Sequence, residues 1–367
     1  MSRLARASVD LDALRHNLAV ARAQASDANL MAVLKADAYG HGLLPVAHEL
    51  AEGVDAFAVS CLEEALPLRM AGLGHRIVLL EGFFDAAEIG TFSARGLDAV
   101  IHQPWQIEAL AEADISAPID CWLKVDTGMG RLGFLPEEAP AALDRLRRLP
   151  GVASVRWMTH LASADVPESP ETAAQLERFG ALAGSAGDAA GSSAANSAAT
   201  LHGREAHADW VRPGIMLYGA SPFEDAGIHP PLRPVMTLEA ALISVKDLPA
   251  GHGVGYGARF VCPERMPVGV VSIGYGDGYP RHAPDGTPVR INGERCALIG
   301  KVSMDMICVD LRPARQARVG DTATLWGDAP LATEIAGYCG TISYALFCQL
   351  TPRIRRVYRR GASHGQG

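Results

Sequence analysis

The sequence predicts an α/β protein, a (β/α)₈ TIM barrel followed by a mainly antiparallel β domain. Through the first part of the chain, short runs of apolar and β-branched residues alternate with apolar residues at helical spacing, which is typical of repeated strand–helix units. From Met236 onward the apolar runs are short and broken by Gly, Pro and Asp, as in an antiparallel sheet. Because 367 residues suit two domains, we expect a barrel over residues 1–234, whose first few residues are free to pair with the second domain, and a β domain over residues 235–367.

The first predicted element is a helix that begins after Asp10, a residue type that caps helices. Leu11, Leu14 and Leu18 then recur at spacings of three and four, as one buried helix face requires. Eight strand candidates follow, at residues 31–34, 56–59, 77–80, 99–101, 121–125, 155–158, 198–201 and 214–217. Eight parallel strands with helices between them close into a barrel, whose active site lies at the carboxyl ends of the strands.

Two later segments complete the prediction. Residues 180–199 are rich in Ala, Ser and Gly, and we expect a helix followed by a short loop, with a flexible linker as the alternative. In the β domain, the run from Val268 to Ile273 is bounded by Pro267 and Gly274 and is a typical short strand. The arginine-rich segment from Arg353 to Arg360 is expected to be a solvated tail.

Composition narrows the functional class. The chain has 33 basic and 41 acidic residues and a net charge of −8, which disfavours attraction to nucleic acid. It begins without the apolar run of a secretory signal, and no stretch approaches the ~18 apolar residues of a membrane-spanning helix. Seven cysteines without a C-x-x-C pair indicate reduced packing residues and no metal site. We therefore expect a cytoplasmic protein with no nucleic-acid or membrane partner.

Lys35 is the first candidate for chemistry, because it follows the predicted strand at residues 31–34 directly. Burial disfavours the charged form of a lysine, and a neutral amine is what a Schiff-base lysine needs. The segment from Val33 to Gly42 reads VLKADAYGHG, so small residues and a tyrosine hydroxyl follow the lysine and leave room for a ligand. Without this context, a lysine that reaches solvent at a strand end would be the ordinary interpretation.

This segment resembles the cofactor-lysine signature of the alanine racemases, which bind pyridoxal 5'-phosphate. The resemblance extends over nearly the whole chain, because further blocks follow in the order found in the family. These are KVDTGMGRLG at 124–133, THLA at 159–162, NSAA at 196–199, VRPGI at 211–215, GVGYG at 253–257, GYGDG at 274–278, SMD at 303–305 and TISY at 341–344. The family has a barrel followed by a β domain, and its members are homodimers whose active sites use residues of both subunits.

The resemblance implies an isomerase that interconverts L-alanine and D-alanine, either supplying D-alanine for peptidoglycan or serving alanine catabolism. Racemisation removes the Cα proton from one face and returns a proton to the other, so two acid/base groups are needed. Lys35 is implied for the D-face and Tyr256 of the second subunit for the L-face. Because free tyrosine is protonated at neutral pH, Tyr256 needs help, and His160 is the implied neighbour.

The resemblance also assigns residues to the cofactor. Arg212 is implied to face the pyridine nitrogen, where a permanent cation keeps that nitrogen unprotonated and weakens the ring as an electron sink. Hydroxyl groups and backbone N–H donors suit the phosphate. The implied cofactor-binding residues are Lys35, Tyr39, Arg131, His160, Asn196, Ser197, Arg212, Gly214, Ile215 and Tyr344.

The remaining implied positions concern the substrate. Arg131 and the Met304 amide resemble contacts to the substrate carboxylate and a cofactor oxygen. Lys124 matches a position that is carbamylated in some members and then orients the arginine seven residues on, here Arg131; carbamylation here is a hypothesis. The implied entrance residues are Tyr275, Tyr344, Asp165 and Arg281, and two rings there favour a side chain as small as methyl. Lys301 departs from the family pattern, which has arginine there.

Three other functional classes remain to be weighed against this prediction. The segment from Gly253 to Ala258 fits a loose dinucleotide fingerprint, but the Arg259-Phe260-Val261-Cys262-Pro263 that follows lacks the helix start that such a loop must open. A non-catalytic pyridoxal-phosphate carrier resembles a single barrel without the β domain. A barrel-type amino-acid decarboxylase would share the lysine but not the block around Tyr256.

Overall fold

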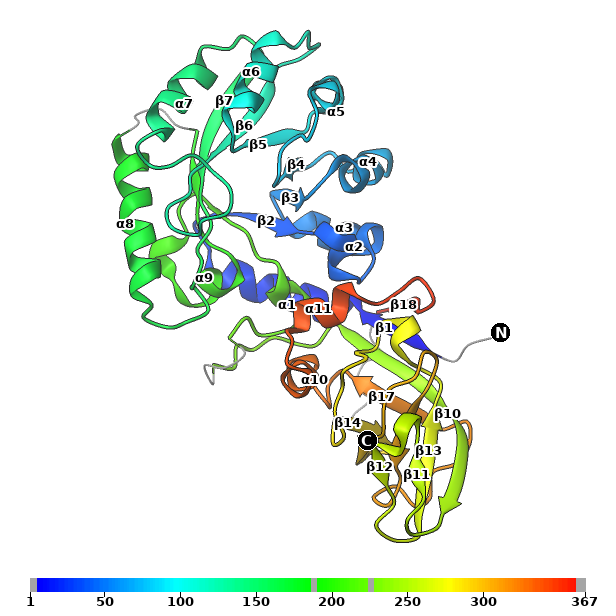
Figure 1. The fold of residues 1–367 in the computed structure, drawn as a ribbon. Helices are drawn as coiled ribbons and strands as arrows, with labels where there is room; N and C mark the ends of the chain where they lie inside the picture. The colour runs from blue at the N-terminus through cyan, green and yellow to red at the C-terminus, as the bar shows by residue number, and fades with distance from the viewer. Residues whose placement is uncertain (1–4, 186–189, 224–227, 361–367) are drawn as a thin grey trace.

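The computed structural model describes residues 5–185, 190–223 and 228–360 of the chain. It confirms the predicted fold class, an eight-stranded parallel barrel joined to a mainly antiparallel β domain (Figure 1). The barrel strands, neighbours in chain order, are β2 (Asn29–Val33), β3 (Ala56–Val59), β4 (Arg76–Leu79), β5 (Asp98–Ile101), β6 (Ile119–Lys124), β7 (Val152–Met158), β8 (Ser192–Ser193) and β9 (Trp210–Val211). β9 pairs with β2 and closes the ring.

Helices cover the outside of the barrel (Figure 1). They are α1 (Leu11–Gln24), α3 (Leu43–Leu50), α4 (Leu62–Met70), α5 (Ile89–Arg95), α6 (Pro104–Glu112), α7 (Ala139–Arg147), α8 (Pro170–Ser185) and α9 (Ser197–His202), and the one-turn α2 (Lys35–Tyr39) follows β2. The predicted first helix is confirmed, since the Asp10 carboxylate accepts the N–H groups of Asp12 and Ala13 and caps α1. Leu11, Leu14 and Leu18 lie on its buried face.

Two predicted strands are wrong. Residues 198–201 belong to helix α9, because the Asn196 side chain accepts the Ala199 N–H and caps a short run that contains the good helix formers Ala198, Ala199 and Leu201. Residues 214–217 fall on Gly214 and the 3₁₀ helix Ile215–Tyr218. The seventh and eighth barrel strands are instead β8 and β9, which lie just upstream of the two predicted segments. Because each has two residues, they are too short to show a period in the sequence. Of the segment 180–199, Gly180 to Ser185 are helical as predicted, and residues 186–189 lie outside the described part.

The β domain is built on one eight-stranded sheet in the order β13-β16-β15-β14-β17-β10-β1-β18, in which β10 also pairs with β13. Its strands are β1 (Arg6–Asp10), β10 (Met236–Leu248), β13 (Met266–Val271), β14 (Pro288–Ile291), β15 (Glu294–Ile299), β16 (Ile307–Asp310), β17 (Thr322–Trp326) and β18 (Arg355–Arg359). A separate hairpin pairs β11 (Gly253–Val254) with β12 (Phe260–Val261). All the pairings are antiparallel except β1 with β18.

Two features of this domain were not predicted. The arginine-rich segment is no solvated tail, because β18 pairs with β1 and Arg356 donates to the Gly40 carbonyl at 3.1 Å. Two helices, α10 (Ala332–Cys339) and α11 (Ser343–Cys348), precede β18 and lie between the sheet and the barrel (Figure 1). The strand β1 and the helix α11 thus connect the domain to the barrel, and α11 lies beside α2 at the carboxyl ends of the barrel strands.

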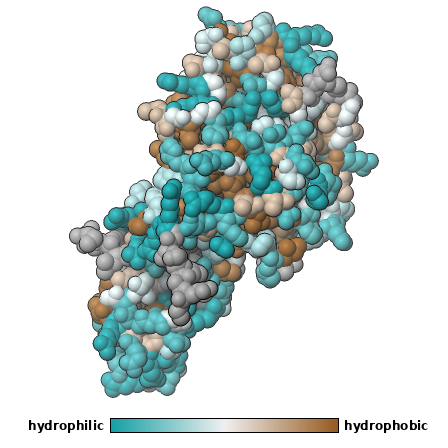
Figure 2. Space-filling view, turned by 180° about the vertical axis from the view of Figure 1, so that it is seen from behind, coloured by the Kyte–Doolittle hydropathy of each residue, from teal (hydrophilic) through white to brown (hydrophobic). Residues whose placement is uncertain are grey.

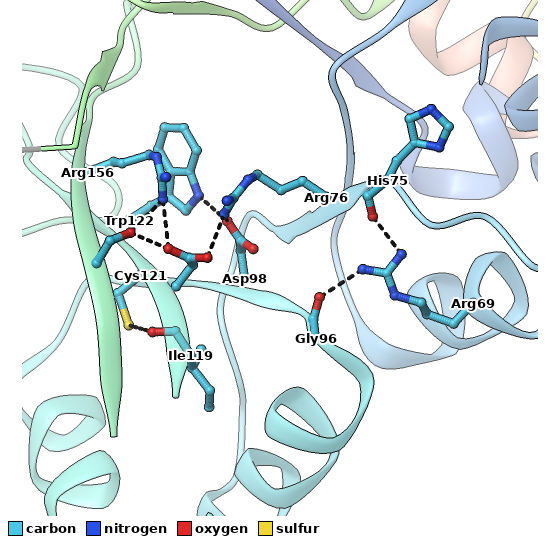
Figure 3. Close-up of polar contacts among 11 residues, drawn as sticks. Arg69, His75, Arg76, Gly96, Asp98, Ile119, Cys121, Trp122 and Arg156 are labelled. Carbon is cyan, nitrogen blue, oxygen red and sulfur yellow. Dashed lines mark hydrogen bonds and ion pairs between the residues drawn. The ribbon is translucent and has the colours of Figure 1, made fainter. Parts of the chain in front are cut away.

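The amino-terminal end of the barrel is closed by charged side chains. Asp98 at the start of β5 forms an ion pair with Arg76 of β4 and accepts the Trp122 indole N–H at 2.9 Å. Arg156 of β7 pairs with Asp120 of β6 at 3.0 Å (Figure 3). Buried charges are stable only when they are paired and hydrogen-bonded, as these are. The cluster lies at the end of the barrel opposite to the expected active site.

The polar character of the surface agrees with the content of charged residues in the sequence. The face shown in Figure 2 is mostly hydrophilic, with separate hydrophobic patches over the barrel. In the described part of the chain, every helix is too short or too polar to cross a membrane. All seven cysteines are free, and most are buried or half-buried, but the prediction that all are packing residues is wrong for Cys348, which is exposed and borders the cavity described next.

Candidate active site

A cavity of about 440 Å³ opens at the carboxyl ends of the barrel strands. It brings together the sequence-predicted residues of the barrel except Asp165, together with Tyr344 of α11. Those lining it are Lys35, Tyr39, Lys124, Arg131, His160, Asn196, Ser197, Arg212, Gly214, Ile215 and Tyr344. Lys35 stands two residues beyond the end of β2, and Lys124 is the last residue of β6. Four of the lining residues, Lys35, Lys124, Arg131 and Arg212, carry cationic groups, so the cavity suits an anion.

The segment after Lys35 has an unusual backbone. Ala36, Asp37, Ala38 and Tyr39 all have φ between 52° and 55°, which places four consecutive residues with side chains in the left-handed region. Each such residue costs about 1 kcal/mol or more. The Asp37 carboxylate accepts the Leu43 N–H at 2.7 Å, and the Glu64 carboxylate accepts the Ala36 N–H at 2.6 Å. These contacts hold the turn that follows Lys35.

Donors for a phosphate gather where Tyr39 meets the start of the 3₁₀ helix Ile215–Tyr218. The Gly214 N–H donates to the Ser197 hydroxyl at 2.8 Å, and Ile215 opens the helix, so no preceding turn supplies a carbonyl for its N–H. A side chain at position 214 would lie 2.6 Å from the Tyr39 hydroxyl, which explains the glycine there. Burial, with Tyr344 and Cys348 nearby, raises the pKa of Tyr39, so its hydroxyl stays protonated.

Arg212 is buried and lines the cavity, and both of its Nη atoms form hydrogen bonds. It donates to the Ser193 hydroxyl at 2.6 Å and to the carbonyls of Thr159 and Ala194 at 2.7 and 3.2 Å. Burial lowers its pKa to about 10, which leaves it charged at neutral pH. Nη2 has two hydrogens and three nearby acceptors, so its third contact, 3.2 Å to Nδ1 of His160, is a shared one; because a guanidinium can only donate, the contact favours Nδ1 as an acceptor.

The contact with Arg212 favours a neutral His160 ring with its proton on Nε2. Burial, and then the charges of Arg212, Lys124, Arg131 and Lys35, lowers the pKa of His160 well below its ordinary value. A protonated ring would also bring two N–H donors together at the contact with Arg212. In this neutral form His160 can donate a hydrogen bond from Nε2.

Arg131 is presented by a loop that returns to its own strand. The Phe134 N–H bonds the Lys124 carbonyl, and the Asp126 N–H bonds the Phe134 carbonyl, both at 2.9 Å. Between them, the Asp126 carboxylate accepts the N–H groups of Gly128, Met129, Gly130 and Arg131 at 2.9–3.1 Å. Although partial burial acts in the opposite direction, these four donors lower the pKa of Asp126. The guanidinium of Arg131 is left at the cavity wall.

The cavity also has lining residues that were not predicted from the sequence. Glu81 is its one acidic lining residue in the described part of the chain, and Cys348 borders it from α11. Glu81 follows β4 by two residues, as Lys35 follows β2, so its strand-end position was the available signal. The apolar lining residues Val33, Leu80, Leu132 and Met158 carried no signal, since core residues look the same in a sequence.

Five of the predicted positions lie in the β domain and do not line this cavity. Tyr256, Tyr275 and Met304 are 67%, 39% and 53% exposed. The Arg281 guanidinium lies 5.7 Å from the centre of the Tyr275 ring, and Lys301 lies beside Gly257, next to Tyr256. Asp165 borders a second hollow of about 780 Å³ that shares His160, Asn196 and Tyr344 with the cavity. The hairpin that carries Tyr256 holds a single 3₁₀ turn where a dinucleotide loop would open a helix.

Comparisons with known proteins agree over both parts of the chain. Residues 9–222 match the family model "Alanine racemase, N-terminal domain", and residues 235–358 match "Alanine racemase, C-terminal domain". An alanine racemase of Halorhodospira halophila is 53% identical over 97% of this chain and 98% of its own length. The catabolic alanine racemase of Pseudomonas aeruginosa is 49% identical over 97% and 99%.

The solved structures show the same relationship. The crystal structure of the biosynthetic alanine racemase from Pseudomonas aeruginosa matches with a TM-score of 0.94 and 45% identity, covering 98% of this chain and all of that one. Both the cavity and the β domain lie within the matched length. The chain belongs to the alanine racemase family.

Proposed function

We propose that this protein interconverts L- and D-alanine with pyridoxal 5'-phosphate bound at Lys35 and with Tyr256 of a second subunit as the opposing acid/base group. The observation that carries the proposal is the cavity, in which a lysine amine, a donor-lined phosphate cradle and a buried arginine face one space. These residues fit the cofactor, which has an aldehyde, a phosphate and a pyridine nitrogen. When bound, it withdraws electrons from the substrate Cα and so acidifies its proton.

The phosphate would be held by Tyr39, Ser197 and the amides of Gly214 and Ile215, with Tyr344 beside them. Ser197 Oγ accepts the Gly214 N–H at 2.8 Å, which leaves the hydroxyl hydrogen of Ser197 free to donate to the phosphate, while the Gly214 N–H would turn from Ser197 to the ligand. Arg212 would face the ring nitrogen. Its hydrogen bonds to Ser193, Thr159 and Ala194 fix its orientation before any ligand arrives, which lowers the cost of binding.

Lys35 and Tyr256 would hold and move the proton at Cα on opposite faces of the substrate. The Lys35 amine reaches the cavity from the strand end, while Arg131 binds the substrate carboxylate through its fork of N–H donors. With its proton on Nε2, His160 would donate a hydrogen bond to the oxygen of the second subunit's Tyr256 and so orient that phenol for proton transfer. The neutral His160 thus assists the second acid/base group without exchanging protons itself.

The proposal includes a homodimer. Tyr256, Met304 and Tyr275 are exposed in the single chain and lie apart from the Lys35 cavity, although large apolar side chains favour burial. The second hollow, which opens beside the cavity and contains Asp165, offers a surface that a second β domain would cover. Met304 would supply its backbone amide there, and Tyr275 and Tyr344 would narrow the entrance to a methyl-sized side chain.

The proposal is tested with the purified protein loaded with pyridoxal 5'-phosphate, by following the loss of optical activity of L-alanine. The substitution Lys35→Ala should abolish racemisation and the absorbance of covalently bound cofactor. Lys246→Ala, which removes an exposed lysine of β10, is the matched control and should retain both. Racemisation that persists in Lys35→Ala, or a wild-type protein that binds cofactor without racemising alanine, would contradict the proposal.

A further inference from the structure

The carboxylate of Glu64 joins the two loops that follow neighbouring barrel strands. Oε1 accepts the N–H of Ala36, the residue after Lys35, at 2.6 Å. Oε2 accepts the N–H of Ser60, the residue after β3, at 2.9 Å. Glu64 itself lies in the first turn of α4 and is not among the residues that line the cavity. One side chain therefore holds the backbone next to Lys35 without reaching the space in which the chemistry takes place.

Capping of its own helix accounts for only half of this arrangement. A glutamate in the first turn of a helix commonly accepts an N–H from the residues just before the helix, and the bond from Ser60 is of that kind. The bond from Ala36 joins residues 28 positions apart and crosses to another strand–helix connection. Helix capping does not require it.

The Ala36 N–H has a particular need for such an acceptor. Ala36 begins the four-residue left-handed turn, so its N–H lies outside any right-handed helical ladder. An unpaired backbone N–H is costly, and a carboxylate forms stronger hydrogen bonds than a neutral acceptor. A carboxylate also offers an acceptor to each of the two N–H groups, whereas a glutamine would offer one oxygen and turn its NH₂ toward the other.

We propose that Glu64 is a positioning residue for Lys35: by fixing the Ala36 amide to the loop after β3, it sets the backbone from which the lysine side chain enters the cavity. This inference rests on the proposed role of Lys35. A displacement of about 1 Å in a reacting group lowers turnover by up to about a hundredfold, so a bond one residue from the lysine is close enough to matter. Substrate binding, which depends on Arg131, should change little.

The test compares Glu64→Ala and Glu64→Gln with Glu63→Ala and Glu63→Gln, which alter the exposed neighbour in the same helical turn. Amide hydrogen exchange at Ala36, measured by mass spectrometry on the full chain, reports the bond itself. We expect exchange to be about tenfold or more faster in Glu64→Ala, since a bond to a charged acceptor is lost, and intermediate in Glu64→Gln. The Glu63 variants should match the wild type.

Steady-state kinetics on the loaded enzyme then separate positioning from general destabilisation. We expect kcat for L-alanine to fall about tenfold in Glu64→Ala while KM stays within about threefold, with partial recovery in Glu64→Gln. A loss of kcat that only follows the fraction of unfolded protein, judged by thermal melting, would overturn the inference. So would unchanged exchange at Ala36, or faster exchange with unchanged kcat.

The two proposals fail in different ways. A wild-type protein that does not racemise alanine would remove the proposed function, while exchange at Ala36 would still show whether Glu64 holds this amide. Conversely, an active wild type whose Glu64 and Glu63 variants behave alike would leave the function standing and overturn the role of Glu64. If Glu64→Ala does not fold, Glu64→Gln carries the same comparison, because it keeps the size of the side chain.

Discussion

Burial and neighbouring positive charges both lower the pKa of Lys124. The side chain is 8% exposed at the end of β6, and burial, followed by the charges of Arg212, Arg131 and Lys35, lowers its pKa to about 8, with Glu81 opposing. At pH 7 about one tenth of such an amine is neutral, against well under one in a thousand for a free lysine. A neutral amine can attack CO₂, and the resulting carbamate would be an anion among cations.

We therefore predict that Lys124 carries a carbamate when bicarbonate is present. The ammonium first loses one proton; the nitrogen of the neutral amine then bonds to the carbon of CO₂ and releases a second proton, so a buried cation becomes an anion beside Arg131 and Arg212. Carbon NMR of protein equilibrated with ¹³C-bicarbonate should show one protein-bound carbamate signal. The signal should be lost in Lys124→Met and kept in Lys246→Met; its absence from the wild type at pH 8 would contradict the prediction.

At the scale of single elements, the left-handed turn after Lys35 depends on the buried ring of His41. Its Nδ1–H donates to the Tyr39 carbonyl at 2.8 Å, and the ring lies 4.6 Å from that of Tyr218. Its Nε2 has no hydrogen-bond partner among the residues that the structure describes. Burial lowers the pKa of His41 to about 4, against the opposing effect of the backbone carbonyls of Tyr39 and Ala38.

This predicts a loss of stability in mild acid. At pH 7 His41 is neutral in both the folded and the unfolded chain, so it contributes nothing. As the pH falls below about 6.5, His41 becomes protonated in the unfolded chain, whereas in the folded chain it stays neutral until about pH 4. The free energy of unfolding therefore falls by up to about 3 kcal/mol. Denaturant unfolding at pH 7.5 and pH 5 should show a smaller difference for His41→Phe than for the wild type or for His252→Asn, an exposed control. An equal difference in all three would count against it.

The charged cluster at the amino-terminal end of the barrel should affect stability alone. Burial raises the pKa of Asp98 to about 6, with Arg76 and the Trp122 donor opposing, so the carboxylate is charged at neutral pH beside its partner. Arg76→Met leaves that charge buried without its ion pair and should destabilise the fold by about 3–5 kcal/mol. The double variant with Asp98→Asn should recover most of this loss. Denaturant unfolding measures both, and kcat should be unchanged; a lower kcat in the double variant would show coupling to the site.

The elements also show how far the sequence could predict the fold and the site. Asp10 and the leucine spacing identify α1 because a cap and a buried face are both local signals. β8 and β9 were missed because a two-residue strand is held by its neighbours in the ring, which no local pattern records. Glu64 was missed for the same reason, since its bond to Ala36 exists only once β2 and β3 lie side by side. Lys35, by contrast, stands in a long contiguous motif.

At the scale of the whole molecule, the residues proposed for the reaction lie on two separate parts of the chain, the barrel and the β domain. The barrel holds Lys35, Arg131 and Arg212 at one cavity, while Tyr256 and Met304 are exposed on the β domain. β1 pairs with β10 and β18, which ties the first strand of the chain into the second domain and limits how far the two parts can move. Because the chain itself does not bring Tyr256 to Lys35, a second copy must supply the missing group if racemisation uses both.

This division predicts that two inactive variants restore activity when they are mixed. Lys35→Ala and Tyr256→Phe should each be nearly inactive as homodimers. After denaturation and refolding together, half of the dimers are mixed, and each has one site with an intact lysine from one chain and an intact tyrosine from the other. Activity should therefore return to about one quarter of the wild type. Mixing without subunit exchange is the control and should give none. If each site used Lys35 and Tyr256 of the same chain, every site in the mixed dimer would lack one group, and no activity would return.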